Sequence, residues 1–331
     1  MRLARLALVS AAMAAAPVVC PAAVLFSETF EADDTADRWQ TNRVTAGLLG
    51  NEANYTFDYS AVGIPAAPNS VGGGTRGLKL EANIPGTATF TGLSASPLGQ
   101  AFTGNYTLRA DVWQNFNGPF PAGGSGSTQV TWAGIGTNGT TPQFPGTSVQ
   151  GVGVGATGDG GSQQDYRAYT NTGAPLLPSS GAYSAGTTDA PAASDSRQAS
   201  NPYYVNAGFG GETATAGQLE LFPQQTGATA PGTQGMAWHV WEIVKNENIV
   251  TWSIDGVLIS TVDVTNEPFG GDNIFLGHFD INTTSSTDPN ARDLLFGLFD
   301  NVVVTDVIPE PSALSLLASG GLVALRRRRR H

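Results

Sequence analysis

Short runs in which apolar and polar residues alternate follow one another along most of the chain, separated by loops rich in Gly, Pro, Asn and Ser. In residues 106–116 the apolar positions alternate with Thr107, Arg109, Asp111 and Trp113. Alternation with a period of two is the pattern of a half-buried strand, and several such runs with turn signals between them indicate an antiparallel sandwich. The pattern therefore predicts an all-β fold.

The same pattern predicts strands at residues 24–30, 75–81, 128–135, 149–156, 237–244, 249–254, 257–264, 273–279 and 294–304, with short pieces at 88–91 and 165–169. Asp255-Gly256 between two of these runs predicts a two-residue type I′ turn. Glycines at alternate strand positions, Gly153 and Gly155, predict backbone crowding or a curved sheet. The first and last strands are expected to meet in one sheet, as in a closed sandwich.

Residues 158–234 differ from the rest, because they are rich in Gly, Ser, Thr, Ala and Pro and poor in aliphatic side chains. We expect long loops here, around two or three short ordered pieces. Loops of this length are uncommon inside a compact domain. They form either a functional rim or poorly ordered decoration, and the sequence leaves both open.

Composition supports the all-β prediction and argues against one class of binding partner. The 42 glycines and a charged fraction of 13% argue against a helical protein. Seven of the 16 basic residues lie at the two ends of the chain, which leaves nine in the core against 26 of the 27 acidic residues, a core charge of −17. Such a surface repels phosphate backbones, so nucleic acid is not an expected partner. It suits divalent cations or neutral glycans, and equally it serves plain solubility outside a cell.

The first 23 residues have the pattern of a secretory signal peptide. Two arginines, Arg2 and Arg5, precede an apolar stretch at residues 6–19, and small residues follow at Ala22 and Ala23. The single cysteine, Cys20, leaves with this segment if cleavage falls after Ala22 or Ala23. The mature chain would then have no disulfide and no thiol nucleophile.

The last residues carry three features in order: Pro309-Glu310-Pro311, an uncharged apolar run at 312–325, and the arginines Arg326, Arg327, Arg328, Arg329 and Arg330. A 14-residue helix spans about 21 Å, short of a hydrocarbon core of roughly 30 Å. A transient membrane helix is therefore favoured over a permanent stop-transfer anchor.

This arrangement resembles the PEP-CTERM sorting signal of Gram-negative bacteria. The resemblance implies that an exosortase, a transpeptidase-like enzyme of the inner membrane, processes the chain near Pro-Glu-Pro. The protein would be held transiently in that membrane and then delivered to the cell surface or extracellular matrix. The expected organisation is a signal peptide at 1–23, a β-sandwich at 24–306 and a sorting signal at 307–331.

A second resemblance concerns the core. Trp238-His239-Val240-Trp241-Glu242-Ile243-Val244, followed by Val250-Thr251-Trp252-Ser253-Ile254-Asp255-Gly256, resembles paired strands of concanavalin A-like lectins and glucanases. The resemblance implies a jelly-roll β-sandwich, here with long Gly/Ser-rich loops.

Hydrolytic chemistry is not expected. Glucanases of that fold carry a Glu-x-Asp-x-Glu run, or one with an extra residue before the last Glu, which places the carboxylates on one face of a strand. No such run occurs in this sequence. His239 and His278 are expected to be packed strand residues and not metal ligands.

The candidate sugar-binding residues are Trp113, Gln114, Asn115 and Asn117, an aromatic ring with amide side chains beside it. The alternative is that Trp113 belongs to the core. A structural calcium ion is a second candidate ligand, because acidic loops supply the oxygen atoms that it prefers. The acidic residues chosen for it are Asp159, Asp165, Asp272 and Asp288.

The sequence thus predicts an exported, surface-sorted, non-enzymatic sandwich that associates with extracellular polysaccharide and binds glycan. Two alternatives stay open. One is a glycan-active hydrolase with an unrecognised carboxylate pair, and the other is a purely structural protein of the matrix or envelope.

Overall fold

The computed structural model describes residues 22–44, 50–84, 90–121, 128–145, 149–171, 173–187, 195–283, 288 and 290–307. Contacts divide the chain into the unit Val24–Asp306 and a second unit made of Met1–Ala23 and Val307–His331. The Pro-Glu-Pro sequence, the apolar run, the terminal arginines and nearly all of the signal peptide lie outside the described residues. Within the described residues, no helix has the length and apolar character needed to cross a membrane.

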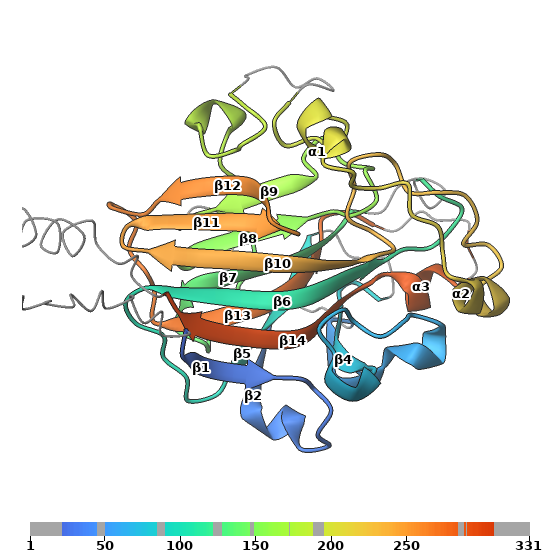
Figure 1. Ribbon diagram of the computed structural model, residues 1–331, viewed down its shortest axis with the longest axis horizontal. Helices are drawn as coiled ribbons and strands as arrows, with labels where there is room; N and C mark the ends of the chain where they lie inside the picture. The colour runs from blue at the N-terminus through green and yellow to red at the C-terminus, as the bar shows by residue number, and fades with distance from the viewer. Residues whose placement is uncertain are drawn as a thin grey trace, which may run out of the picture. The chain divides into compact units, whose positions relative to one another are not determined.

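Two antiparallel sheets form the unit Val24–Asp306, which confirms the expected all-β sandwich (Figure 1). The first sheet has the strand order β12-β11-β10-β6-β14-β4-β3, and β1 pairs with β14 beside this path. Its strands are β1 (Val24–Glu28), β3 (Glu52–Asp58), β4 (Arg76–Glu81), β6 (Tyr106–Asn115), β10 (Trp238–Asn246), β11 (Ile249–Ile254), β12 (Val257–Asp263) and β14 (Phe296–Asp306).

The second sheet has the order β2-β5-β13-β7-β8-β9. Its strands are β2 (Trp39–Arg43), β5 (Thr91–Pro97), β7 (Gln129–Thr137), β8 (Val152–Ala156), β9 (Tyr166–Tyr169) and β13 (Asn273–Asp280). Every strand pair in the two sheets is antiparallel.

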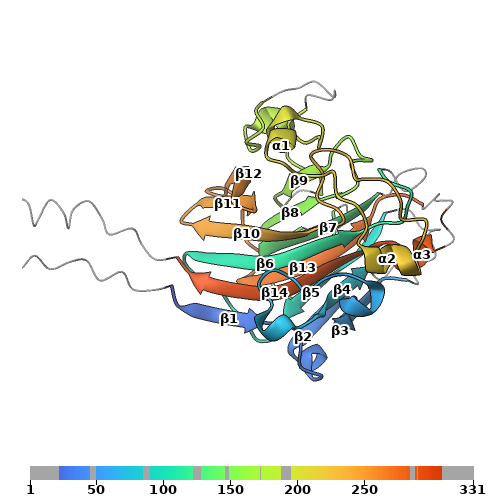
Figure 2. The same cartoon turned by 45° about the vertical axis from the view of Figure 1, so that its right-hand side comes forward.

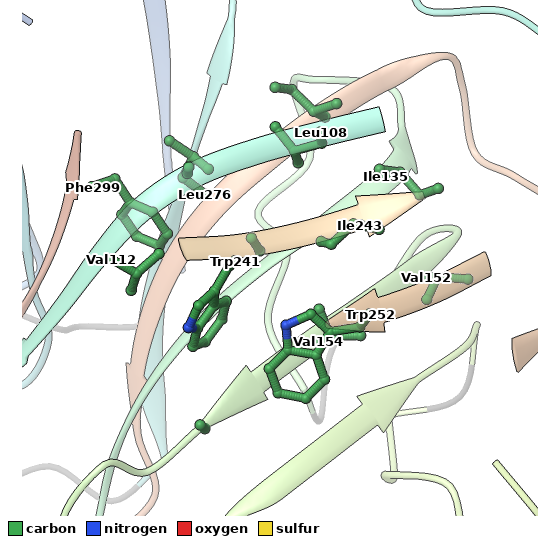
Figure 3. Close-up of a cluster of buried hydrophobic side chains, with 14 of the residues drawn as sticks. Leu108, Val112, Ile135, Val152, Val154, Trp241, Ile243, Trp252, Leu276 and Phe299 are labelled. Carbon is green, nitrogen blue, oxygen red and sulfur yellow. The ribbon is translucent and has the colours of Figure 1, made fainter. Parts of the chain in front are cut away.

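The main core lies between the sheets, where side chains from one face of each sheet meet. Figure 3 shows Trp241 and Trp252 of the first sheet in the same cluster as Val154 and Leu276 of the second. The alternation expected for residues 106–116 is confirmed. The apolar positions of β6 join this cluster, whereas Trp113 belongs to a different cluster on the other face.

The outer face of the second sheet carries an apolar cluster centred on Trp132. A Cβ atom added at Gly277 would lie 2.2 Å from Nε1 of Trp132, and one added at Gly153 would lie 2.7 Å from Cζ3. The indole therefore rests directly on glycine backbone, which confirms the crowding predicted from the alternate glycines of β8.

The Gly/Ser-rich region contains short helices between its loops. Figures 1 and 2 both place α1 at the end of the sandwich where β9 and β12 lie, and α2 beside α3. The short helices of the described residues are η1 (Thr35–Arg38), η2 (Tyr59–Val62), η3 (Val71–Gly73), η4 (Pro178–Ser180), α1 (Pro202–Asn206), α2 (Ala216–Leu221) and α3 (Ala291–Leu294).

Two local predictions are confirmed by the backbone. Asp255 and Gly256 have φ values of 50° and 78°, as a type I′ turn between β11 and β12 requires. The terminal strands β1 and β14 are paired, with Val24 opposite Thr305. Both ends of the unit Val24–Asp306 therefore lie side by side in one sheet.

Candidate functional site

The residues chosen for sugar stacking lie at the end of β6 and are buried. Trp113 is 2% exposed, and its ring centroid lies 5.8 Å from that of Trp238 in an edge-on arrangement. It belongs to a cluster on the outer face of the first sheet with residues such as Tyr59 and Leu298. Trp113 therefore lies in an apolar cluster, as the alternative interpretation expects. In this conformation its ring is not exposed for a sugar to stack on.

The three amides beside Trp113 point to different places. The Nε2 atom of Gln114 donates to the carbonyl oxygen of Ala156, 2.6 Å away, on the opposite face of β6. Nδ2 of Asn115 donates to the carbonyl of Leu294 at 2.9 Å. Asn117 is 1% exposed. Gln114 and Asn115 therefore hold the end of β6 to neighbouring segments, and the four buried residues do not form one open patch.

The four aspartates chosen for calcium are distributed over three parts of the fold. Asp159 and Asp165 lie in the connection from β8 to β9, Asp272 lies just before β13, and Asp288 lies just before α3. Oδ2 of Asp288 accepts a hydrogen bond from the backbone N–H of Gly118 at 3.1 Å. Within the described part of the chain no three His, Cys, Asp or Glu side chains come together to hold a metal ion. Calcium binding stays a prediction.

Asp165 does border a pocket of about 360 Å³, and every residue that lines this pocket comes from the Gly/Ser-rich region. Three stretches of that region, near residues 160–165, 198–205 and 230–231, supply the walls. The lining residues are Gly160, Ser162, Asp165, Gln198, Ala199, Ser200, Val205, Ala230 and Pro231. The region that the sequence left undecided between rim and decoration thus forms a concave site.

The carboxylate of Asp165 is fixed in the wall of this pocket. Its Oδ1 atom accepts a hydrogen bond from Oγ1 of Thr157 at 2.5 Å, and its Oδ2 atom accepts one from the backbone N–H of Ala199 at 2.8 Å. Burial raises the pKa of Asp165, and these hydrogen bonds oppose the rise. The side chain is 4% exposed, so it acts mainly to order the two loops that it joins.

Two stacked aromatic rings connect segments of the chain that form the pocket. The ring centroids of Tyr166 and Tyr204 are 4.0 Å apart, with 25° between the ring planes. Oη of Tyr166 donates to the carbonyl of Gly232 at 2.5 Å, and Oη of Tyr204 donates to the carbonyl of Ser196 at 2.6 Å. These contacts join β9, helix α1 and the 230–232 loop. The wall that carries Val205 is therefore held to the sheet.

The pocket combines hydroxyl, amide and carboxylate groups with a small apolar wall, and no basic side chain lines it. Groups of this kind can bind hydroxyls by hydrogen bonding and cover the C–H face of a small ring. An anionic ligand would meet no compensating charge among the lining residues. The site therefore suits a neutral, hydroxyl-rich ligand.

The structure also brings together two carboxylates that the sequence analysis did not pair. Asp111 of β6 lies directly opposite Asp300 of β14, and each is 1% exposed. Burial raises the pKa of Asp300 to about 7, and the neighbouring Asp111 contributes to the rise. The search for carboxylates along one strand could not find a pair that forms across two strands almost 190 residues apart in the sequence.

Both histidines within the sandwich are packed strand residues, as expected. His239 is 8% exposed, and its Nδ1 atom lies 2.6 Å from Oδ2 of Asp255. His278 is 2% exposed, and burial lowers its pKa to about 3. The imidazole of His278 is therefore neutral at any ordinary pH.

No family model and no curated protein matches the chain. Solved structures with similar folds do exist. A Bacillus subtilis protein with a galectin-like fold covers 87% of this chain and 98% of its own length at 8% identity and a TM-score of 0.41. The carbohydrate recognition domain of Emp47p covers 82% of this chain and 90% of its own length, at 9% identity and a TM-score of 0.40. A Bacillus licheniformis β-glucanase covers 86% of this chain and 98% of its own length, at 13% identity and a TM-score of 0.38. At these TM-scores no site or activity is carried over from any of them.

Proposed function

We propose that the protein is an exported, surface-sorted and non-enzymatic β-sandwich that binds a neutral glycan of the extracellular polysaccharide in the pocket beside Asp165. The single observation that supports this is the composition of the pocket wall. Its hydroxyl and amide groups match the hydroxyls of a sugar, and Val205, Ala230 and Pro231 offer an apolar surface for the ring.

The charge of the core supports the choice of a neutral ligand. A core charge of −17 disfavours acidic polymers and nucleic acid at long range, and no basic side chain lines the pocket. A neutral glycan carries no penalty from this field. Binding through hydrogen bonds and ring contact would also depend little on salt concentration.

A role in hydrolysis would need two carboxylates that a substrate can reach. Asp111 and Asp300 are paired across neighbouring strands, but each is 1% exposed and covered by residues 67–70. Glycosidases place their acid and nucleophile on either side of the bond that is cut. While residues 67–70 cover the pair it offers no such access, which supports the non-enzymatic proposal.

The glycan proposal is tested on an array of neutral and acidic glycans, with the purified protein in calcium and in chelator. We expect saturable binding to neutral glycans and a loss of at least tenfold in Val205→Trp, because the indole would fill the pocket. Val71→Trp is the matched control, since Val71 is 91% exposed in η3 and does not line the pocket. Equal binding by both variants, or no binding of any glycan, would overturn the proposal; the second result would favour a structural role.

The calcium arm decides the role of the acidic loops. Binding that survives the chelator means that the pocket acts through hydrogen bonds alone. Binding that requires calcium would assign an ion to the aspartates near the pocket, Asp159 and Asp165 first.

The sorting proposal rests on the terminal sequence and has its own test. An exosortase-type enzyme should process the chain after export, so replacing Pro309-Glu310-Pro311 by alanines should leave the protein in the membrane fraction. Asp306→Ala, which changes a nearby acidic residue outside the signal, should still be released. Unchanged release of the triple variant would contradict the proposal.

A further inference from the structure

The facing carboxylates Asp111 and Asp300 hold down a segment that crosses the outer face of the first sheet. This segment, residues 59–74, is called the strap; it begins with η2 and ends after η3. Oη of Tyr59 donates to Oδ2 of Asp300 at 2.9 Å, and Oγ of Ser70 donates to the same atom at 3.1 Å. Asn69 donates to Asp111 through its backbone N–H at 3.0 Å and through Nδ2 at 2.6 Å.

A backbone irregularity in β14 completes the network. Asn301 has a φ of 49°, and the register between β14 and β6 shifts just after Asp300. The backbone N–H of Asn301 donates to Oδ1 of Asp300 at 2.6 Å, and its Nδ2 atom donates to Oδ2 of Asp111 at 2.8 Å. Bulges of this kind redirect side chains. Here the bulge places Asn301 so that its backbone N–H donates to one carboxylate and its side-chain amide to the other.

Among the described residues, no basic side chain compensates the charge of the pair, because neither carboxylate has a hydrogen bond or ion pair with one. On β6, Arg109 lies two residues from Asp111, opposite Glu242 of β10 and Val303 of β14. The other charged groups of the surrounding elements have partners elsewhere: Lys79 with Glu81 on β4, Arg76 with Asp33, Asp58 with Ser60 and Thr75, and His239 with Asp255.

Two buried carboxylates that face one another are stable together only when at least one carries a proton. The two carboxylates accept hydrogen bonds from different kinds of donor, and this difference indicates that Asp300 is the one that carries the proton. Asp111 accepts three N–H groups from Asn69 and Asn301, whereas two of the three donors to Asp300 are the hydroxyls of Tyr59 and Ser70. A hydroxyl can rotate to accept a proton from a neutral carboxyl group, but an N–H group cannot.

We propose that Asp111 and Asp300 form a proton-operated latch, in which a proton on Asp300 keeps the strap closed and its loss favours an open strap. In the open state Asp300 is solvated and titrates at its ordinary value near 4. The closed state therefore binds the proton more tightly, and raising the pH from about 4 to about 7 shifts the equilibrium toward the open state, by up to about tenfold per pH unit.

Opening would uncover aromatic rings that the strap now covers. Tyr59 contacts Trp238 edge-on with ring centroids 5.1 Å apart, and Ile64 packs in the same cluster as Trp113. The release of these two strap residues would expose both indoles on the face of the sheet. The latch would thus control access to an aromatic surface whose two indoles do not line the pocket at Asp165.

Hydrogen–deuterium exchange of the full-length protein tests the latch. Protection of peptides within residues 59–74, corrected for the intrinsic pH dependence of exchange, should fall progressively from about pH 4 to about pH 7, the raised pKa of Asp300, and then level off. Asp300→Asn should abolish this dependence, because the amide cannot ionise. Asp58→Asn is the matched control: Asp58 is an exposed carboxylate directly before the strap, and its replacement should leave the wild-type dependence intact.

A second variant keeps the test decisive if Asp300→Asn does not fold. Asp111→Asn removes the facing charge, so Asp300 of the closed state should ionise at a lower pH. The loss of protection should then still begin near pH 4 but end at a lower pH than in the wild type. Protection of the strap that is constant from pH 4 to pH 7 in the wild type would overturn the proposal. So would a pH dependence that persists unchanged in the variants of both aspartates.

Discussion

The imidazole of His278 lies inside the sandwich with its Nε2 atom 2.8 Å from Oε1 of Gln129, on the adjacent strand β7. Its Nδ1 atom lies 3.1 Å from Oγ1 of Thr131 on the same strand. Both contacts come from neutral groups, and burial lowers the pKa of His278 to about 3. Between about pH 3 and pH 6.5 this imidazole is therefore neutral in the folded chain, whereas in the unfolded chain it binds a proton.

This gives the first prediction, on the pH dependence of stability. His278 binds a proton in the unfolded chain below about 6.5, but in the folded chain only below about 3. Stability from this group is thus complete above pH 6.5 and lost as the pH falls, by up to about 1.4 kcal/mol per unit. Asp300, with its pKa raised to about 7, acts in the opposite direction, because the folded chain holds its proton longer.

The contributions of the two groups should oppose each other between pH 4 and pH 6.5, and single variants should separate them. In urea unfolding, the profile of stability against pH should become more negative in slope in His278→Gln than in the wild type, and more positive in Asp300→Asn. The double variant should return toward the wild-type slope. Identical profiles for the two single variants would contradict this account.

The second prediction concerns Trp113, which is a core side chain. Trp113→Ala leaves a cavity in the cluster on the outer face of the first sheet, and we expect a loss of about 3–5 kcal/mol in the free energy of unfolding. Leu177→Ala is the control, since Leu177 is 63% exposed, and it should change stability by less than about 0.5 kcal/mol. Wild-type stability in Trp113→Ala would show that the indole does not hold this cluster.

The third prediction concerns the glycine beneath Trp132. In Gly277→Ala the new Cβ atom would meet the indole at 2.2 Å, so the ring or the strand must move, at a cost of about 1–3 kcal/mol. Gly161→Ala is a matched substitution in a loop, where the nearest atom is a carboxylate oxygen of Asp159 at 3.2 Å that can shift. Denaturant midpoints compare the two. Equal midpoints would mean that the ring tolerates a methyl group at this position.

The fourth prediction concerns the turn between β11 and β12. Gly256 has a φ of 78° with nothing near its missing Cβ, so the cost of Gly256→Ala comes from the backbone alone and should be about 1–2 kcal/mol. Leu258→Ala in the same hairpin, where the side chain is 39% exposed, should cost less. The prediction is checked by thermal unfolding of both variants, and it fails if the order of their stabilities is reversed.

The strands that the sequence predicts best are those with strict alternation and clear turns. Residues 237–264 are an example: β10, β11 and β12 follow the predicted runs closely, because one face of each strand is buried and the turn requires positive φ values. The prediction for β5 reached only its first residue, Thr91, and strands β2 and β3 were not predicted. Trp39 is the one large apolar residue of β2, and a bulge in β3 interrupts its alternation, so neither shows a period of two.

The candidate sites were harder to predict for a physical reason. The pocket is made of small residues whose side chains carry no periodic signal, and its shape arises from three loops that meet in space. Trp113 was recognised as important, but a tryptophan with amides beside it has the same sequence pattern at a surface and beneath a covering segment. The pairing of Asp111 with Asp300 depends on strand order, which a single sequence does not reveal.

The pairing of β1 with β14 has a mechanical consequence. Interstrand hydrogen bonds run perpendicular to antiparallel strands. A pull on the chain at Asp306, directed along β14, would therefore load the bonds of β14 to β6 and β1 together in shear, instead of opening them one at a time. A sandwich tethered through this strand would resist a steady drag on its tether better than one attached through an edge hairpin.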